Sequence, residues 1–188
     1  MESVESFTTN NKHELKGNMN QGKKFEQNFA KSVPKDVYFM RIKDTVSSYS
    51  HGDGSSFTSN NPFDCFMLYN GFFLPMELKS SKEDRFSVQI EEGKTGYDIK
   101  LHQIKSLTQA NNFDNVIAGF VLDFRCGNTY WISILDFNRC LADTGKKSIN
   151  SKDVESHNGI IISKKIMRVN YKYDILELLG KITSKEGG

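Results

Sequence analysis

The sequence predicts a mixed α/β domain, a β-sheet flanked by helices, from three observations. Near the N-terminus, Phe25, Phe29 and Val33 recur at four-residue spacing, which gives a helix one apolar face. The pair Asn70-Gly71 separates two β-rich runs, and this is the strongest short-range signal for a hairpin. Helix-like and strand-like runs then alternate toward the C-terminus, an order typical of a sheet with helices on its faces.

The remaining elements are predicted from the same signals. The first helix is expected to begin near Asn18 or Asn20, both adequate N-caps, and to end at Pro34. The expected strands are residues 37–42, 63–69, 72–79, 116–124, 130–135 and 159–162. The other expected helices are residues 99–110, residues 136–141 with Asp136 as cap, and residues 173–182. Residues 85–96 are expected to form a loop.

Two segments are expected to be flexible and to flank or interrupt a single domain over residues 18–183. Residues 1–17 mix Ser, Thr, Asn, Lys and Glu without periodicity and are predicted to form a tail. Residues 45–61 are rich in Ser, Gly and Asn, which cannot bury enough apolar surface to fix one conformation. This loop is expected to be poorly ordered without ligand.

The composition limits the class of protein. The chain has 188 residues, of which 37% are hydrophobic and 26% charged, so it is expected to be globular. No apolar run approaches the roughly 18 residues that span a bilayer, and no secretory segment is recognisable, so a membrane protein is not expected. The scattered thiols of Cys65, Cys126 and Cys140 fit a reducing cytoplasm and have no spacing typical of a zinc site.

The distribution of charge is more informative than its sum. The formal net charge is +2, but residues 12–43 carry eight basic residues against three acidic ones. A second basic stretch covers residues 146–168. Such stretches can follow a phosphate backbone, and the alternative is that they are ordinary solvated lysines.

The hairpin predicts a meeting of two carboxylates. With the Asn-Gly pair at the centre of the turn, Asp64 falls opposite Glu77, where side chains stand roughly 4.5–5.5 Å apart at Cβ. Lys79 lies two residues beyond Glu77 and therefore shares its face. Two like charges in this position destabilise a sheet unless a cation compensates, and Mg²⁺ is commonly held by one or two carboxylates. The alternative is an ordinary exposed hairpin with surface acids.

These three residues match the needs of phosphodiester hydrolysis. A bound metal ion can activate water and neutralise the charge that develops on the phosphate. An ammonium group beside it can orient the nucleophile or stabilise the transition state. A Glu-x-Lys tripeptide is common in itself, and its pairing with Asp64 through the turn is what points to a nuclease.

The same residues resemble a known signature. Asn61-Pro62-Phe63-Asp64, followed by Glu77-Leu78-Lys79, resembles the signature of PD-(D/E)xK nucleases. The surrounding chain, over roughly residues 18–182, resembles the RecU-type Holliday junction resolvases, including phage-borne relatives. The segments that resemble the family in order are N-Q-G-K-K-F-E at 20–26, H-Q-I at 102–104, A-G-F-V at 118–121, Y-W-I at 130–132, G-K-K-S-I at 145–149 and R-V-N-Y at 168–171.

The resemblance implies a restriction-endonuclease-like sheet and a set of site residues. It implies Mg²⁺, with Mn²⁺ able to substitute, held by Asp64 and Glu77, and Lys79 as the stabiliser of the transition state. Gln103 would lie beside the metal, or else be a solvent-facing amide. Glu26 would point toward the metal from the first helix, or else be a surface acid. Pro62 stands where the family has threonine, so a metal contact by this residue would need its carbonyl. The DNA contacts that we expect from the two basic stretches are Lys23, Lys24, Arg41, Lys146 and Lys147.

The implied function is a homodimeric enzyme of a bacterial cell or phage-infected host. It would resolve four-way DNA junctions by paired cuts in recombination and repair, and the 45–61 loop would contact the junction. Residues 37–61 are shorter than the protruding stalk of bacterial RecU proteins. The alternatives are another PD-(D/E)xK nuclease or a DNA-binding protein that does not cut. Residues 116–124 and 130–135 could supply the dimer surface, or be covered by helices of the same chain.

Overall fold

The structure is a computed structural model that describes residues 9–42 and 61–186. Residues 1–8 and almost all of the expected loop at residues 45–61 lie outside the described residues, so the predictions made for them stay predictions. None of the described helices combines the length and the apolar character that crossing a membrane requires.

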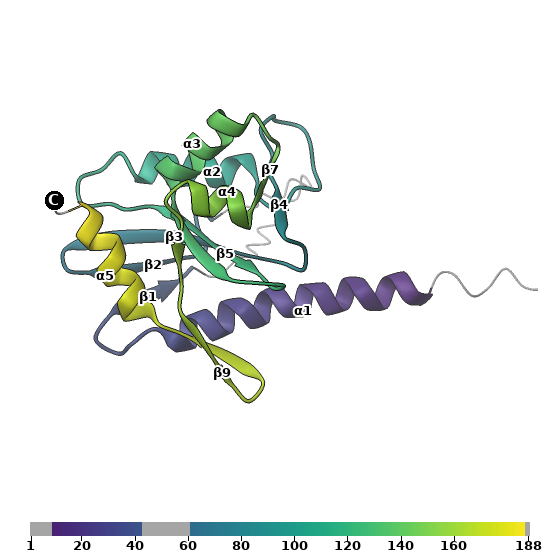
Figure 1. Ribbon diagram of the computed structural model, residues 1–188, viewed down its shortest axis with the longest axis horizontal. Helices are drawn as coiled ribbons and strands as arrows, with labels where there is room; N and C mark the ends of the chain where they lie inside the picture. The colour runs from purple at the N-terminus through teal and green to yellow at the C-terminus, as the bar shows by residue number, and fades with distance from the viewer. Residues whose placement is uncertain (1–8, 43–60, 187–188) are drawn as a thin grey trace, which may run out of the picture.

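The centre of the molecule is a six-stranded mixed sheet, which confirms the predicted fold class (Figure 1). Its strands lie in the order β1-β2-β3-β5-β6-β8, and only β3 and β5 are parallel neighbours. The bounds are β1 Tyr38–Arg41, β2 Cys65–Tyr69, β3 Phe72–Ser81, β5 Gly119–Phe124, β6 Thr129–Ser133 and β8 Ile160–Ile161. Two small two-stranded sheets pair β4 (Arg85–Ser87) with β7 (Ser148–Asn150), and β9 (Lys164–Met167) with β10 (Asn170–Tyr173).

Helices cover both faces of the sheet and form two cores (Figure 1). One face packs on α1 (Thr9–Ser32) and α5 (Ile175–Glu186), with Phe29 and Leu179 against Met76 and Val121 of the sheet. The other face packs on α2 (Leu101–Ala110), α3 (Ile134–Thr144) and α4 (Ser151–Ser156). Phe120 and Leu122 of β5 belong to this second core, so β5 is buried from both sides.

The β2–β3 hairpin forms as its sequence predicts. Asn70 and Gly71 both have positive φ, 49° and 82°, which is the type I′ turn that matches the twist of two antiparallel strands. Gly71 adopts this conformation without the steric cost that a side chain brings. The turn sets Cys65 opposite Met76, and the expected register is confirmed.

Several expectations about local structure are wrong. The first helix begins at Thr9, so residues 9–17 are helical rather than part of a tail; no proline interrupts the chain before Pro34. The cap of α3 is Ser133, whose hydroxyl accepts from the Asp136 N–H, rather than Asp136 itself. The sequence also did not indicate α4, β4, β7 or the β9–β10 hairpin. The turn of that hairpin contains Arg168 at φ 57° and has no Asn-Gly signal.

Residues 116–124 and 130–135 are not the exposed dimer surface that the sequence allowed. Every residue of β5 is buried, as are the first four of β6. Helices on both faces of the sheet cover these strands, so the second interpretation, burial within the chain, holds.

Candidate active site

The hairpin brings Asp64 to Glu77. Asp64 is the residue just before β2, so the register that pairs Cys65 with Met76 places it beside Glu77 of β3. One carboxylate oxygen of Asp64, Oδ2, accepts a hydrogen bond of 2.8 Å from the backbone N–H of Leu78. This bond fixes the Asp64 carboxylate against β3 at the residue next to Glu77.

Glu77 is buried and held from two sides. Its exposed fraction is 2%, which excludes the alternative of an ordinary hairpin with surface acids. Oε1 of Glu77 lies 3.0 Å from Nζ of Lys79, which shares its face of β3 as predicted. The same oxygen accepts a hydrogen bond from the side-chain amide of Gln103 on α2. The Lys79 ammonium and the Gln103 amide therefore hold the buried Glu77 carboxylate in place.

The environment shifts the proton affinity of Glu77. Burial, which disfavours the charged form, and the nearby Asp64 carboxylate together raise its pKa to about 7. The Lys79 ammonium acts in the opposite direction by favouring the charged form. Perturbed groups of this kind cluster at functional sites, which makes this pair the leading candidate in the described chain.

Gln103 joins the site from a different element. It lies in the first turn of α2, where its Oε1 accepts from the backbone N–H of Lys100 at 2.9 Å while its amide donates to Glu77. With 8% of its surface exposed, Gln103 is not the solvent-facing amide of the alternative interpretation. The neighbouring His102 entered the sequence analysis only as part of the H-Q-I segment. Its pKa is lowered by partial burial and by the charges of Lys100 and Lys79. It therefore lies near the same lysine.

Glu26 and Arg41 form an ion pair beside this centre. Arg41 is the strand partner of Cys65, and it binds the Glu26 carboxylate of α1. Burial raises the pKa of the Cys65 thiol, and the charges of Asp64, Glu77, Arg41 and Glu26 also act on it. Glu26 is therefore near the site, bound to Arg41, and its contact with a metal stays a prediction.

The other expected contact residues have different surroundings. Pro62 is exposed and lies two residues before Asp64 in the short segment that leads into β2. Lys23 and Lys24 are exposed on α1, and both line hollows on that side of the protein. A DNA contact by either lysine is untested.

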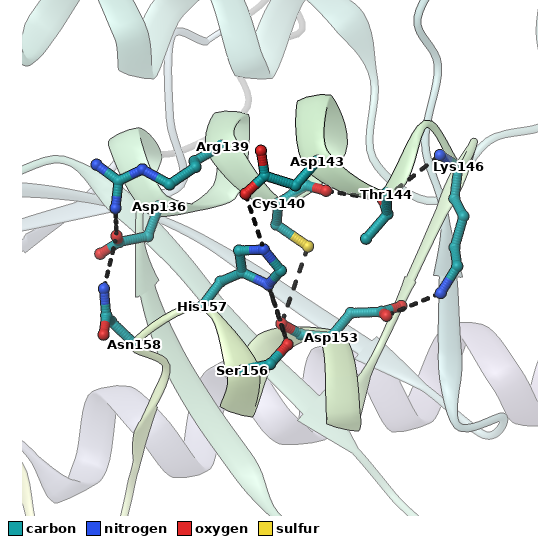
Figure 2. Close-up of polar contacts among 10 residues, drawn as sticks. All are labelled: Asp136, Arg139, Cys140, Asp143, Thr144, Lys146, Asp153, Ser156, His157 and Asn158. Carbon is teal, nitrogen blue, oxygen red and sulfur yellow. Dashed lines mark hydrogen bonds and ion pairs between the residues drawn. The ribbon is translucent and has the colours of Figure 1, made fainter.

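Lys146 and Lys147 are engaged in ion pairs. Figure 2 shows Lys146 in a polar cluster between α3 and α4, with its Nζ 2.9 Å from Asp153. In this cluster, His157 contacts the Asp153 carbonyl at 2.8 Å and lies 3.4 Å from an oxygen of Asp143. Lys147 pairs with Glu91 at 3.2 Å. These contacts connect helix ends and loops, so the cluster is explained by packing.

The residues of the candidate site fit a hard divalent cation. No group of three or more His, Cys, Asp or Glu that could hold a metal occurs within the described residues. The site instead combines two carboxylates with the amide of Gln103, and Mg²⁺ is commonly bound through one or two carboxylates with water and phosphate completing its shell. A cation there would relieve the repulsion that raises the Glu77 pKa.

Comparison with known proteins found a relative in sequence and similar solved structures. No family model matches the chain. The chain is 33% identical over 186 residues to the SPbeta prophage-derived uncharacterized protein YotM of Bacillus subtilis (strain 168), covering 90% of both chains. It is similar at a TM-score of 0.47 and 14% identity to Hjc, a Holliday junction resolvase of Archaeoglobus fulgidus, over 74% of this chain and 95% of that one.

Proposed function

Since the chain belongs to the same family as the prophage-derived protein YotM, we propose on the geometry of its site that it is a metal-dependent DNA endonuclease. The observation that carries the proposal is the set around Glu77. This buried carboxylate lies beside Asp64, within 3.0 Å of Lys79 and under the amide of Gln103. Such a set has no evident packing role, because its members are polar groups gathered at the margin of an apolar core.

The roles of the residues follow from their positions. Asp64 and Glu77 would hold Mg²⁺ or Mn²⁺, which when bound supplies an activated water and neutralises charge on the phosphate. Lys79 presents its ammonium two residues from Glu77, where it can stabilise the negative charge that grows on the phosphate oxygens. Gln103 keeps Glu77 oriented through a hydrogen bond that is itself fixed by the helix end.

The substrate we propose is branched DNA, with the four-way junction as its leading form. The segments that resemble the RecU-type family, which occur in order along the chain, support this choice. Because residues 37–61 are shorter than the family's stalk, selectivity for the junction is the property to measure. The alternatives are another PD-(D/E)xK nuclease that cuts duplex DNA and, with less support from an intact Asp64, Glu77 and Lys79 set, a protein that binds without cutting.

We further propose that the working unit is a homodimer that makes paired cuts. A four-way junction has an approximate two-fold axis, and one site per chain in a C2 dimer matches it. The surface that fits this role is the outer part of the sheet at β1 and β2. Three large apolar side chains are exposed there, Tyr38 at 52%, Met40 at 44% and Leu68 at 47%. Strand pairing places all three on the same face of the sheet as Glu77.

A paired cleavage assay tests the activity and the substrate together. A four-way junction and a linear duplex of the same sequence are incubated with the purified protein in Mg²⁺, in Mn²⁺ and in EDTA, beside the Asp64→Asn variant. We expect cleavage of the junction only with metal and only by the unaltered chain. Equal cleavage of both substrates would favour the duplex nuclease, and no cleavage under any condition would favour the binder.

A further inference from the structure

The β9–β10 hairpin lies beside α1 (Figure 1), and the R-V-N-Y segment at residues 168–171 forms its turn and the start of β10. Tyr173 anchors it, because its ring packs on those of Phe25 and Phe29 with centroids 5.9 and 5.8 Å apart. The backbone N–H of Tyr173 also donates to the hydroxyl of Ser32 at 2.9 Å. The base of the hairpin is therefore fixed to α1, while Val169 near its tip is 75% exposed.

A groove lies between the hairpin and α1. Its first hollow, of about 300 Å³, is lined by Lys24 and Asn28 of α1, by Lys164 and Tyr171 of the hairpin, and by Arg125 after β5. A second hollow of about 440 Å³ continues it along α1 and shares Lys24 and Asn28 with the first. A third, of about 350 Å³, shares Arg125 with the first.

The third hollow connects the groove with the region of the active site. It is lined by Ser80 and Ser81, the two residues that follow Lys79 on β3. The three hollows therefore adjoin one another, from the end of β3, the strand that carries Glu77 and Lys79, to the exposed side of α1. A ligand that follows them would pass close to the site without occupying it.

The groove is basic. The side chains that line its first two hollows include five basic ones, Lys23, Lys24, Lys31, Arg125 and Lys164, and one acidic one, Asp123. Asp123 is buried and bonded to the hydroxyls of Ser80 and Thr129, at 3.0 and 2.7 Å, and it pairs with Lys164 at 3.5 Å. Asp123 and Lys164 offset each other inside the fold, and the exposed lysines of α1, Lys23, Lys24 and Lys31, give the groove its positive charge.

Two further side chains are suited to a nucleotide. The ring of Tyr171 is 41% exposed, and Nζ of Lys164 lies 4.9 Å from its centre, so a flat group would meet an aromatic face beside a cation. Asn28 is only 6% exposed and lines both hollows, so its side-chain amide stands in the wall of the groove. Its amide can donate to a phosphate oxygen or to the edge of a base.

We propose that the groove between α1 and the β9–β10 hairpin binds one unpaired strand of DNA, with phosphates on Lys23 and Lys24 and a base stacked on Tyr171. A basic groove with an exposed aromatic side chain is the arrangement that holds single strands without reading their sequence. The inference rests on the proposed function, because it takes DNA as the ligand. It deepens that function, because it makes the preferred substrate a branched DNA that carries an unpaired arm.

Binding of a fluorescent oligo(dT) to the full-length protein in EDTA tests this, because no cleavage occurs and the metal site is not required. Tyr171→Ala is expected to weaken binding about tenfold and Tyr171→Phe to leave it nearly unchanged, since stacking needs only the ring. Lys24→Gln is expected to lower the slope of log affinity against log salt by about 0.7, the value for one phosphate contact on a single strand. Lys172→Gln, on the opposite face of the hairpin from Tyr171, is the matched control and should change neither value.

Three outcomes would overturn the inference: no measurable binding of oligo(dT), equal losses in Lys24→Gln and Lys172→Gln, or unchanged binding in Tyr171→Ala. The thermal midpoint of each variant is measured beside the binding, and because Tyr171 is exposed we expect it to stay at the wild-type value. The proposed function fails independently, if the chain cuts no DNA. A protein that cuts junctions but ignores oligo(dT) would retain the proposed function and lose only this groove.

Discussion

The side-chain amide of Gln103, on α2, donates a hydrogen bond to the carboxylate of Glu77, on β3, although the two residues are 26 positions apart. The oxygen of the same Gln103 amide, Oε1, accepts a hydrogen bond from the backbone N–H of Lys100, at the start of the same helix. The position of Glu77 is therefore coupled to the end of α2. A helix end thus takes part in ordering the candidate metal site.

Gln103→Ala is expected to raise the Mg²⁺ concentration needed for half-maximal cleavage by roughly 10- to 100-fold, the usual effect of removing a group that orients a metal ligand. DNA affinity in EDTA should stay unchanged. A metal titration of the cleavage rate measures the effect, with Gln109→Ala at the far end of α2 as the control. An unchanged metal requirement would make the Gln103 bond purely structural.

Asp64→Asn and Glu77→Gln are each expected to abolish cleavage while junction binding survives. The two carboxylates are assigned to the metal rather than to DNA, so their loss removes chemistry and leaves the binding surface. Gel-shift binding in EDTA and cleavage in Mg²⁺ are compared on one junction. Near-normal cleavage by both variants would contradict the assignment.

The stability of the metal-free protein is expected to fall as the pH rises from about 4.5 to about 7. The pKa of Glu77 is raised by burial and by Asp64 to about 7, so the folded state binds the proton more tightly than the unfolded state does. The free energy of unfolding is therefore expected to be lower by about 3 kcal/mol above pH 7 than below pH 4.5. Urea unfolding in EDTA at pH 5 and pH 8 measures this, and in Glu77→Gln the difference should shrink. An unchanged difference in that variant would assign the pH dependence to other groups.

Lys79→Ala is expected to lower turnover on the junction by roughly 100-fold or more, with little change in affinity. Its ammonium lies 3.0 Å from Glu77 and is only 19% exposed, a position suited to the transition state rather than to steering DNA. Single-turnover rates and binding constants separate the two effects. A loss of affinity as large as the loss of rate would make Lys79 a simple phosphate contact.

Leu68→Glu is expected to convert the proposed dimer to a monomer, because it places a charge within the exposed apolar surface formed by Tyr38, Met40 and Leu68. Sedimentation gives the mass, with the exposed Leu176→Glu on α5 as a matched control. On a supercoiled cruciform plasmid, the dimer should yield linear product and the monomer nicked circles. A wild-type protein that is monomeric with DNA and yields only nicked circles would rule out paired cutting.

The sequence by itself determined the meeting of Asp64, Glu77 and Lys79. The Asn70-Gly71 turn fixes the register of its two strands locally, and the two-residue period of a strand then puts Glu77 and Lys79 on one face. Nothing remote from the hairpin is needed for this arrangement. For the same reason the apolar face of α1 and the positions of the main strands along the chain could be predicted, since each depends on residues close in the chain.

Only the tertiary structure decided how these residues are surrounded. The burial of Glu77 and its bond to Gln103 depend on α2 packing over the sheet, and β3 lies beside β5, about forty residues further along the chain. The exposed apolar margin at β1 and the basic groove at β9–β10 likewise depend on which faces the helices leave uncovered. Burial and electrostatic coupling arise from contacts between distant segments, and a local pattern specifies the partners of a residue only within its own strand, turn or helix.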